Sequence, residues 1–262
     1  MGSEHDVVAE PIDVLGRIST HTRTTLERLA GRVSEFDDGF AVRTDALPLV
    51  WTLNQVRFVG PTTPAAVIAQ ADRFQDDLPF RHVVVEGDCG ASLVDPLAAE
   101  GWWAERDVVM AMTRPIDREV DTSGVVELSE SQMLGLMRAW LLEEREGVTD
   151  AGLDQVTQYN RLEGALFNET RLGIVEHETA LAVTKLRAGD GIAWVEDVYT
   201  IPSARGRGLA RSLIAEALSR AWRTQPTFAF IFADDDDWPK HFYSRAGFAP
   251  VGHNYAFHRD GG

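Results

Sequence analysis

The 262-residue sequence predicts an α/β (α+β) protein of two similar parts, each a mixed, mostly antiparallel sheet flanked by helices. Two observations support this prediction. Strand and helix patterns alternate through the carboxy-terminal half, and part of the same alternation recurs in the amino-terminal half. A hydrophobic content of 44% is typical of a folded globular protein.

The carboxy-terminal half begins with a helix signal. Ser129 and Gln132 have the spacing of a capping box. Apolar residues follow at helical intervals: Met133, Leu134, Met137, Trp140 and Leu141. A more polar helix is expected near 152–165. Strands are expected near 172–176, 180–186 and 192–200, with a turn at 188–191 between the last two.

A second helix–strand–helix–strand series completes this half. Its first helix has one apolar face, made of Leu209, Leu213, Ile214, Ala217, Leu218 and Ala221. A short apolar strand is expected at 228–233. Pro239 in a first turn and Gly247 as a C-terminal cap predict the limits of the next helix. The final strand is expected at 251–258.

The amino-terminal half repeats this series at an offset of 146 residues. Gly247-Phe248 corresponds to Gly101-Trp102, and the strand at 228–231 corresponds to 82–85. One offset relates both segments without a gap, which a tandem duplication explains most simply; chance agreement of two generic β-α-β-α stretches is the alternative. Apolar periodicity lapses near 115–123, so we expect domains at 1–118 and 119–262.

Charge and composition exclude several classes of function. A net charge of −16 argues against a general nucleic-acid surface. The acidity is explained by solubility, and attraction of a cationic acceptor such as an amine is the alternative. No apolar run approaches the roughly 20 residues of a membrane span. The single cysteine, Cys89, excludes an internal disulfide framework, and a cytoplasmic location is expected.

The most informative segment runs from Val198 to Arg211. A β-branched strand end (Val198, Tyr199, Thr200) precedes a proline turn and then the run Arg205, Gly206, Arg207, Gly208, Leu209, Ala210 and Arg211. Glycines permit close approach of backbone N–H groups to a ligand. A helix N-terminus and three arginines at one place suit a phosphate. These residues are therefore the candidate cofactor-binding set.

This segment resembles the pyrophosphate-binding motif of the GNAT acetyl-CoA-dependent N-acetyltransferases, Arg/Gln-x-x-Gly-x-Gly/Ala. A second stretch, 236–248, is similar to the family's Asn-x-x-Ala-x-x-Leu-Tyr followed by Gly-Phe, with Tyr243 and Gly247-Phe248 at the same spacing. Asp236 replaces the asparagine and Pro239 the alanine. The resemblance covers about 124–262 and implies acetyl-CoA as co-substrate, no metal, and a primary amine as acceptor.

The amino-terminal half has lost these residues. By the same offset, Val59 replaces Arg205, Thr62 replaces Gly208 and Pro64 replaces Ala210. Prolines carry no N–H group to donate. We therefore expect a degenerate GNAT-like half that does not bind the cofactor in this way and packs against its partner.

Acetyl transfer needs a neutral amine, whereas an alkylammonium with a pKa near 10.4 is almost wholly protonated at pH 7. Glu196, on the strand that leads into the motif, is the candidate base; a surface or ion-paired carboxylate is the alternative. A backbone N–H near 198–200 would stabilise the oxyanion, at a place where the family has a strand irregularity. The resemblance makes Tyr243 the general acid toward the leaving thiolate, and a buried packing tyrosine is the alternative.

The sequence bears on three rival interpretations. A dinucleotide fingerprint would need a third glycine where Arg211 stands, and an acid about 20 residues on. Four adjacent carboxylates at 234–237 favour the start of a helix over a metal. A non-catalytic acetyl-CoA sensor or protein-interaction module is the remaining alternative. The acceptor's identity and the oligomeric state cannot be inferred from this sequence.

Overall fold

The computed structural model describes residues 13–116, 119–145 and 147–261. Its helices are α1 (Val14–Leu29), α2 (Pro64–Gln75), α3 (Val94–Ala99), α4 (Glu130–Glu144), α5 (Asp150–Leu166), α6 (Leu209–Arg223) and α7 (Pro239–Ala246). Its strands are β1 (Arg32–Phe36), β2 (Gly39–Arg43), β3 (Val56–Phe58), β4 (Phe80–Glu86), β5 (Trp103–Met112), β6 (Val125–Glu127), β7 (Glu169–Glu176), β8 (Thr179–Gly189), β9 (Ile192–Thr200), β10 (Phe228–Asp234) and β11 (Ala249–Asp260).

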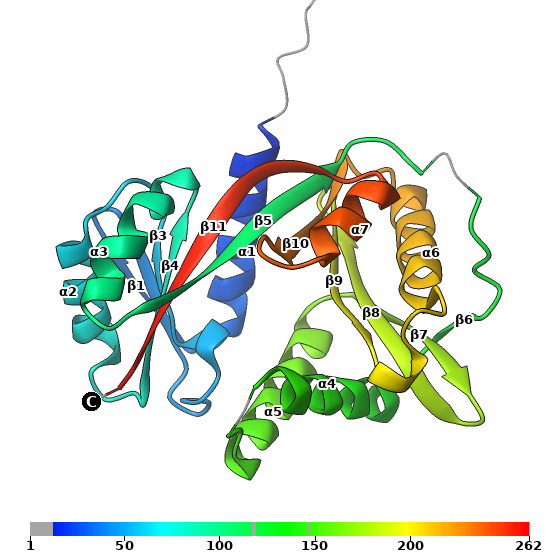
Figure 1. The fold of residues 1–262 in the computed structure, drawn as a ribbon, viewed down its shortest axis with the longest axis horizontal. Coiled ribbons are helices and arrows are strands. Elements are labelled where there is room, and N and C mark those ends of the chain that lie inside the picture. Colours follow the sequence, from blue (N-terminus) through cyan, green and yellow to red (C-terminus); the bar gives the residue numbers. More distant parts are fainter. Residues whose placement is uncertain (1–12, 117–118, 146, 262) are drawn as a thin grey trace, which may run out of the picture.

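The predicted fold class is confirmed: the sheet is mixed, mostly antiparallel and flanked by helices (Figure 1). The two expected sheets are joined into one, in the order β1-β2-β3-β4-β11-β5-β10-β9-β8-β7-β6. Only β3–β4 and β9–β10 pair in parallel among the described strands. These two pairs occupy corresponding places in the two halves, and each leads into a helix at the same point of the repeat.

The two halves exchange their last strands. β5 belongs to the amino-terminal half, yet it pairs with β10 of the carboxy-terminal half. β11, the last strand of the chain, pairs with β4 of the amino-terminal half and with β5. Figure 1 shows β5 and β11 running side by side across the middle of the molecule. The two parts of the repeat therefore share one continuous hydrogen-bonded sheet.

Helices cover both faces of this sheet. Alternate residues of β5 point to opposite sides, so Val108 packs in the core under α6 while Val109 packs against α1. Val183 of β8 packs against α4, whereas its neighbour Ala182 packs under α6. The core between α6, α7 and the sheet and the core under α4 thus lie on opposite faces, and β9 lies between them.

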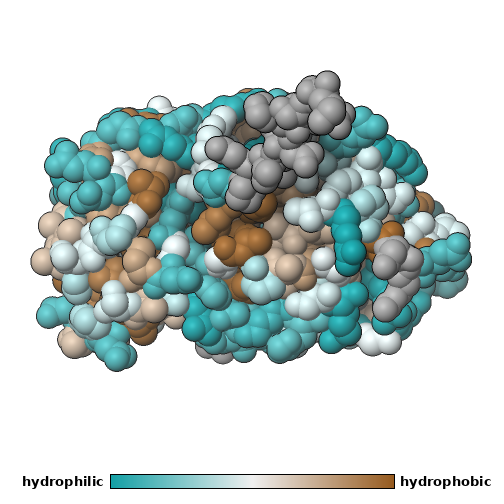
Figure 2. Space-filling model, turned by 90° about the horizontal axis from the view of Figure 1, so that it is seen from above, coloured by the Kyte–Doolittle hydropathy of each residue, from teal (hydrophilic) through white to brown (hydrophobic). Residues whose placement is uncertain are grey.

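Local signals account for the limits of the helices. Both hydrogen bonds of the predicted capping box are present at α4, between Ser129 and Gln132. α7 begins at Pro239 and ends at Ala246, and Gly247 caps it with a φ of 105°, which suits glycine. The described residues include no helix long and apolar enough to cross a membrane. Viewed from above, hydrophilic residues predominate toward the edges of the surface, with apolar residues toward its middle (Figure 2).

Candidate active site

The amino-terminal end of α6 presents an open, uncapped set of backbone groups. Gly206 and Gly208 have φ values of 77° and 81°, in the left-handed region that favours glycine. A Cβ added at either position would meet no atom within 4 Å, so the space before the helix is open. Gly208 is the N-cap and supplies no side-chain cap. The first N–H groups of α6 are therefore available to an anion.

Two of the three predicted arginines are held by carboxylates. Arg205 Nη2 lies 2.6 Å from Glu143 Oε1 at the end of α4, and its Nε donates to the Thr200 carbonyl at 3.0 Å. Arg207 forms an ion pair with Glu176 of β7. The hydrogen bond from Arg205 lowers the pKa of Glu143. Both arginines lie at the helix end, but an incoming phosphate must compete with these partners.

Tyr199 connects α4 to the strand end. Its ring is buried and stacks on Trp140, with 5.9 Å between ring centroids. Its hydroxyl donates to Glu143 Oε2 at 2.9 Å. Burial, with Glu143 beside it, raises the pKa of Tyr199 to about 12. The side chain of Tyr199 thus holds α4 against β9, while its backbone lies in the predicted cofactor segment.

β9 and β10 separate beyond their first three residue pairs. They pair in parallel only from Phe228↔Ile192 to Phe230↔Trp194. Residues 195–200 of β9 and 231–234 of β10 continue without pairing to each other. Backbone groups on this side of β9 are therefore free to bind an extended ligand lying between the strands.

β9 also has a bulge at this opening. The register between β8 and β9 shifts between Val183↔Tyr199 and Lys185↔Glu196, so two residues of β9 face one of β8. Asp197, within the bulge, has a φ of 53°, which is unusual for a residue other than glycine. The irregularity expected from the resemblance is present, three residues before Thr200.

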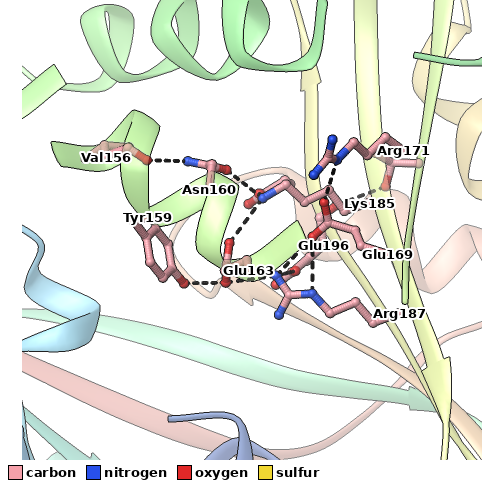
Figure 3. Close-up of polar contacts among 11 residues, drawn as sticks. Val156, Tyr159, Asn160, Glu163, Glu169, Arg171, Lys185, Arg187 and Glu196 are labelled. Atoms are coloured by element: carbon pink, nitrogen blue, oxygen red, sulfur yellow. Dashed lines mark hydrogen bonds and ion pairs between the residues drawn. The ribbon is translucent and has the colours of Figure 1, made fainter. Parts of the chain in front are cut away.

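Glu196 belongs to a buried network of charges (Figure 3). Its Oε1 lies 2.5 Å from Nη2 of Arg187, and its side chain is 15% exposed. Arg187 also contacts Glu163 of α5 and Glu169 of β7, at 2.8 and 3.3 Å. Lys185 is wholly buried and lies 2.6 Å from Asp197 and 3.3 Å from Glu163. These pairings compensate for the removal of the charges from water.

The network holds one more carboxylate than cation. Its cations are Lys185, Arg187 and Arg171, and its carboxylates are Glu163, Glu169, Glu196 and Asp197. Burial raises the pKa of Glu196 to about 8, against the opposing charge of Arg187. Uptake of one proton by Glu196 would balance the network. The geometry therefore suits a group that accepts a proton near neutral pH.

Tyr243 lies on α7, on the face of the sheet that α6 covers. Its side chain is 6% exposed and packs in the core with Phe248. Burial, followed by the carboxylate charge of Asp197, raises the pKa of its phenol. The hydroxyl therefore stays protonated over the whole physiological range, and can donate a hydrogen bond without ionising.

The amino-terminal half closes the corresponding helix end. The N-cap of α2 is Thr63, whose hydroxyl accepts from the Ala66 N–H at 3.2 Å, and Pro64 occupies the first helical position. Proline has no N–H, and the threonine already satisfies one donor. This end of α2 is therefore a capped helix start, in contrast to the glycine N-cap of α6.

The structure brings together most of the predicted site residues. Tyr243 of α7 packs in the same core cluster as Val198 of β9 and Leu209 of α6, whereas Glu196 lies in the separate charged network. Sequence reasoning missed the acidic partners Glu143 and Glu176, which lie 62 and 31 residues from their arginines. It also missed Asp197, Lys185 and Arg187. Isolated charged residues at such separations give no local signal of pairing.

The acidic run 234–237 is used in ion pairs. Arg106 Nη2 lies 2.7 Å from Asp235 Oδ2 and 3.1 Å from Asp236 Oδ1, and Lys240 lies 3.0 Å from Asp235. Within the described residues, no group of three or more His, Cys, Asp or Glu side chains could hold a metal ion. The carboxylates of this run join β5 to the start of α7.

Comparison with known proteins agrees with this geometry. Residues 165–250 match the family described as acetyltransferase (GNAT) domain. The matched segment contains the β9 bulge, the uncapped end of α6 and Tyr243. No curated protein matches the chain.

Solved structures resemble the whole two-part fold. A GCN5-related N-acetyltransferase from Kribbella flavida has 20% identity and a TM-score of 0.66, with 96% of this chain and 98% of that chain covered. A functionally unknown conserved protein from Staphylococcus epidermidis ATCC 12228 has 13% identity and a TM-score of 0.68, covering 88% and 94%. A tandem GNAT protein from the clavulanic acid biosynthesis pathway has 13% identity and a TM-score of 0.50, covering 76% and 68%. At these identities the likeness is one of fold.

Proposed function

We propose that this chain, an acyltransferase of the GNAT family, transfers an acetyl group from acetyl-CoA to a primary amine in a ternary complex. The observation that carries the proposal is the opening between β9 and β10 beside the uncapped end of α6. An elongated thioester fits this arrangement, with its phosphates at the helix end and its arm between the strands.

The cofactor-binding residues proposed are Val198, Tyr199, Thr200, Arg205, Gly206, Arg207, Gly208, Leu209, Ala210 and Arg211. Backbone N–H groups of the glycine turn would hold the pyrophosphate, and the arginines would add charge once released from Glu143 and Glu176. The freed edge of β9 would pair with the amide groups of the pantetheine arm. An N–H group at the bulge would stabilise the oxyanion formed when the amine attacks the thioester carbonyl.

Glu196 is the proposed base. It would take the ammonium proton, directly or through water, and the buried network would then be balanced in charge. The amine nitrogen attacks the carbonyl carbon, the C–S bond breaks, and CoA leaves as a thiolate. Tyr243 would stabilise that thiolate by donating a hydrogen bond. Because the pKa of its phenol is raised, complete transfer of the tyrosine proton is less favourable than hydrogen bonding.

We propose that 119–262 is the catalytic domain and that 1–118 is a degenerate GNAT-like domain. The capped start of α2, with Pro64 at its first position, supports the loss of cofactor binding there. The acceptor is proposed to be cationic, because the chain carries a net charge of −16.

Calorimetric titration with acetyl-CoA tests the proposal. We expect one site per chain, followed by amine-dependent release of thiol when primary amines are screened. Two equivalent sites would contradict a degenerate amino-terminal half. Absence of binding at high micromolar acetyl-CoA would overturn the proposed function and favour a protein-interaction module.

A further inference from the structure

The bulge of β9 holds Asp197 in a backbone conformation that is uncommon for any residue but glycine. Its φ of 53° lies in the left-handed region. Such a conformation costs free energy and persists only where surrounding contacts hold it. The bulge lies at the opening between β9 and β10, where an N–H group is proposed to stabilise the oxyanion. The contacts that hold the bulge therefore bear on the reaction.

Two side chains of β8 fasten the bulge to the neighbouring strand. Thr184 Oγ1 donates a hydrogen bond to the Glu196 carbonyl at 3.0 Å. Lys185 Nζ lies 2.6 Å from Asp197 Oδ2. Thr184 and Lys185 are both wholly buried, so the packed core fixes the direction in which each donor points.

Lys185 is itself held from the other side by α5. An ammonium group carries three N–H donors. Besides its contact with Asp197, Lys185 Nζ donates to Asn160 Oδ1 at 2.7 Å and to Glu163 Oε2 at 3.3 Å (Figure 3). Burial opposes the charge, but the carboxylates of Asp197 and Glu163 outweigh it and raise the pKa of Lys185. Lys185 therefore stays protonated, and its contacts with three acceptors fix its position.

We propose that Lys185 is a positioning residue, which clamps the bulge of β9 through Asp197 and so keeps the oxyanion-stabilising N–H group in place. This inference rests on the proposed function. The contacts run from α5 through Lys185 and Asp197 to the bulge, so the packing of α5 against the sheet becomes part of the catalytic geometry. The alternative is that Lys185 only balances the buried charges of the network and that the bulge forms without it.

Asp197→Asn separates the two roles. Asparagine has nearly the same shape and also tolerates a positive φ, so the backbone preference is kept while the ion pair is lost. The network then holds three carboxylates and three cations, so we expect the variant to fold. Its kcat should fall about 10- to 100-fold, because displacing an oxyanion donor costs less than removing one. Its affinity for acetyl-CoA should change less than about threefold, because the phosphates are proposed to bind at α6.

Asp190→Asn is the matched control. Asp190 is exposed in the turn that joins β8 to β9, and its φ is 51°. The same substitution in the same backbone conformation should change neither kcat nor the affinity for acetyl-CoA. Rates are compared near pH 9, above the pKa of about 8 for Glu196, so that the lost charge of Asp197 does not act through the base. Equal kcat values for the two variants would overturn the inference.

The double variant Lys185→Met/Asp197→Asn tests whether the two residues act together. It removes both charges of the pair, and Glu163 keeps its contact with Arg187 at 2.8 Å. We expect its kcat to lie within about threefold of Asp197→Asn alone, because both variants lose the same contact. Thermal unfolding shows whether the variant is folded. A further loss of about tenfold or more in a folded variant would mean that Lys185 acts through other carboxylates, and would overturn the inference.

Hydrogen exchange separates the clamp from the proposed activity. Backbone N–H groups at 196–199 should exchange about tenfold faster in Asp197→Asn than in the unaltered protein or Asp190→Asn. If exchange increased in this way while the unaltered protein transferred acetyl to no amine, the clamp on the bulge would stand and the proposed activity would fall. If transfer occurred and Asp197→Asn changed neither exchange nor kcat, the activity would stand and the clamp would fall.

Discussion

Glu196 lies in a buried network that is one positive charge short of balance. Because the pKa of Glu196 is raised to about 8, its ionised, proton-accepting form is lost as the pH falls through that value. We predict that kcat/KM falls below pH 8, well above the ordinary glutamate pKa near 4.3. Glu196→Gln should lower kcat/KM by roughly 10²- to 10⁴-fold and abolish this dependence.

Ionisation of the acceptor amine must be separated from ionisation of Glu196. An amine of lysine-like pKa also gives a rising pH profile, but its own limb lies near 10.4. Steady-state rates from pH 6 to 10 with such an acceptor separate the two limbs. If kcat/KM of Glu196→Gln still fell below pH 8, another group would be the proton acceptor.

Tyr243 keeps its proton because its hydroxyl is buried near the charge of Asp197. We predict that Tyr243→Phe lowers kcat about 10- to 100-fold, as expected for loss of a hydrogen bond to a developing thiolate. The affinity for acetyl-CoA should stay within twofold, since the phenyl ring fills the same core position. Rapid-quench and equilibrium titration measure the two quantities; full turnover in a folded variant would disprove the role.

At the level of elements, the turn before α6 combines a left-handed backbone with open space. A Cβ at Gly208 would meet no protein atom within 4 Å, so a side chain there projects into the space where the ligand is proposed to bind. We predict that Gly208→Trp abolishes acetyl-CoA binding. Gly208→Ala should lose the same roughly 1–2 kcal/mol of unfolding free energy as Gly208→Trp, because both place a side chain at a positive φ. It should retain most of the affinity for acetyl-CoA.

Denaturant unfolding and calorimetry on both Gly208 variants check this prediction. If the two variants have similar unfolding free energies but very different affinities for acetyl-CoA, the tryptophan acts by blocking the ligand before the start of α6. Undiminished affinity in Gly208→Trp would show that the cofactor phosphates bind elsewhere.

At the level of the whole molecule, the exchange of β5 and β11 makes each half depend on the other. A fragment 119–262 lacks the strand that pairs with both β10 and β11. A fragment 1–118 lacks β11, the strand that pairs with both β4 and β5. Unpaired central strands expose hydrogen-bonding groups and apolar surface. We predict that each fragment aggregates alone and that the two assemble one-to-one when produced together.

Size-exclusion chromatography of the fragments, separately and together, gives the answer. A monomeric 119–262 fragment that bound acetyl-CoA would mean that each half can retain its own last strand.

A buried histidine pair joins the two halves across the exchanged strands. His82 of β4 and His258 of β11 have their Nδ1 atoms 3.1 Å apart. Burial, then the charge of His258, lowers the pKa of His82 well below its ordinary value. Below pH 6.5 the native state thus binds fewer protons than the unfolded state. The unfolding free energy therefore decreases as the pH is lowered below 6.5.

For one such histidine the slope approaches about 1.4 kcal/mol per pH unit. Urea unfolding between pH 5 and 7.5 measures the slope, and His82→Gln should make it shallower. An equal slope in that variant would place the acid sensitivity elsewhere.

The sequence by itself determined several local elements and the glycine turn before α6. The limits of α4, α6 and α7 follow from a capping box, Gly208, Pro239 and Gly247, all of which act within a few residues. The expected strand at 192–200 has the observed bounds of β9. Repetition at one offset also predicted the series α2, β4 and α3, which corresponds to α6, β10 and α7.

Only the tertiary structure decided which half each last strand joins, and which charges meet. β5 and β11 occupy equivalent places in the repeat, each after a short helix, so their order along the chain does not distinguish their two possible positions. Strand pairing is set by contacts between distant residues. The ion pairs of Arg205, Lys185 and Arg187 depend in the same way on helices α4 and α5 packing against the sheet. Burial then raises the pKa of Glu196, a property that the residue has only in the folded chain.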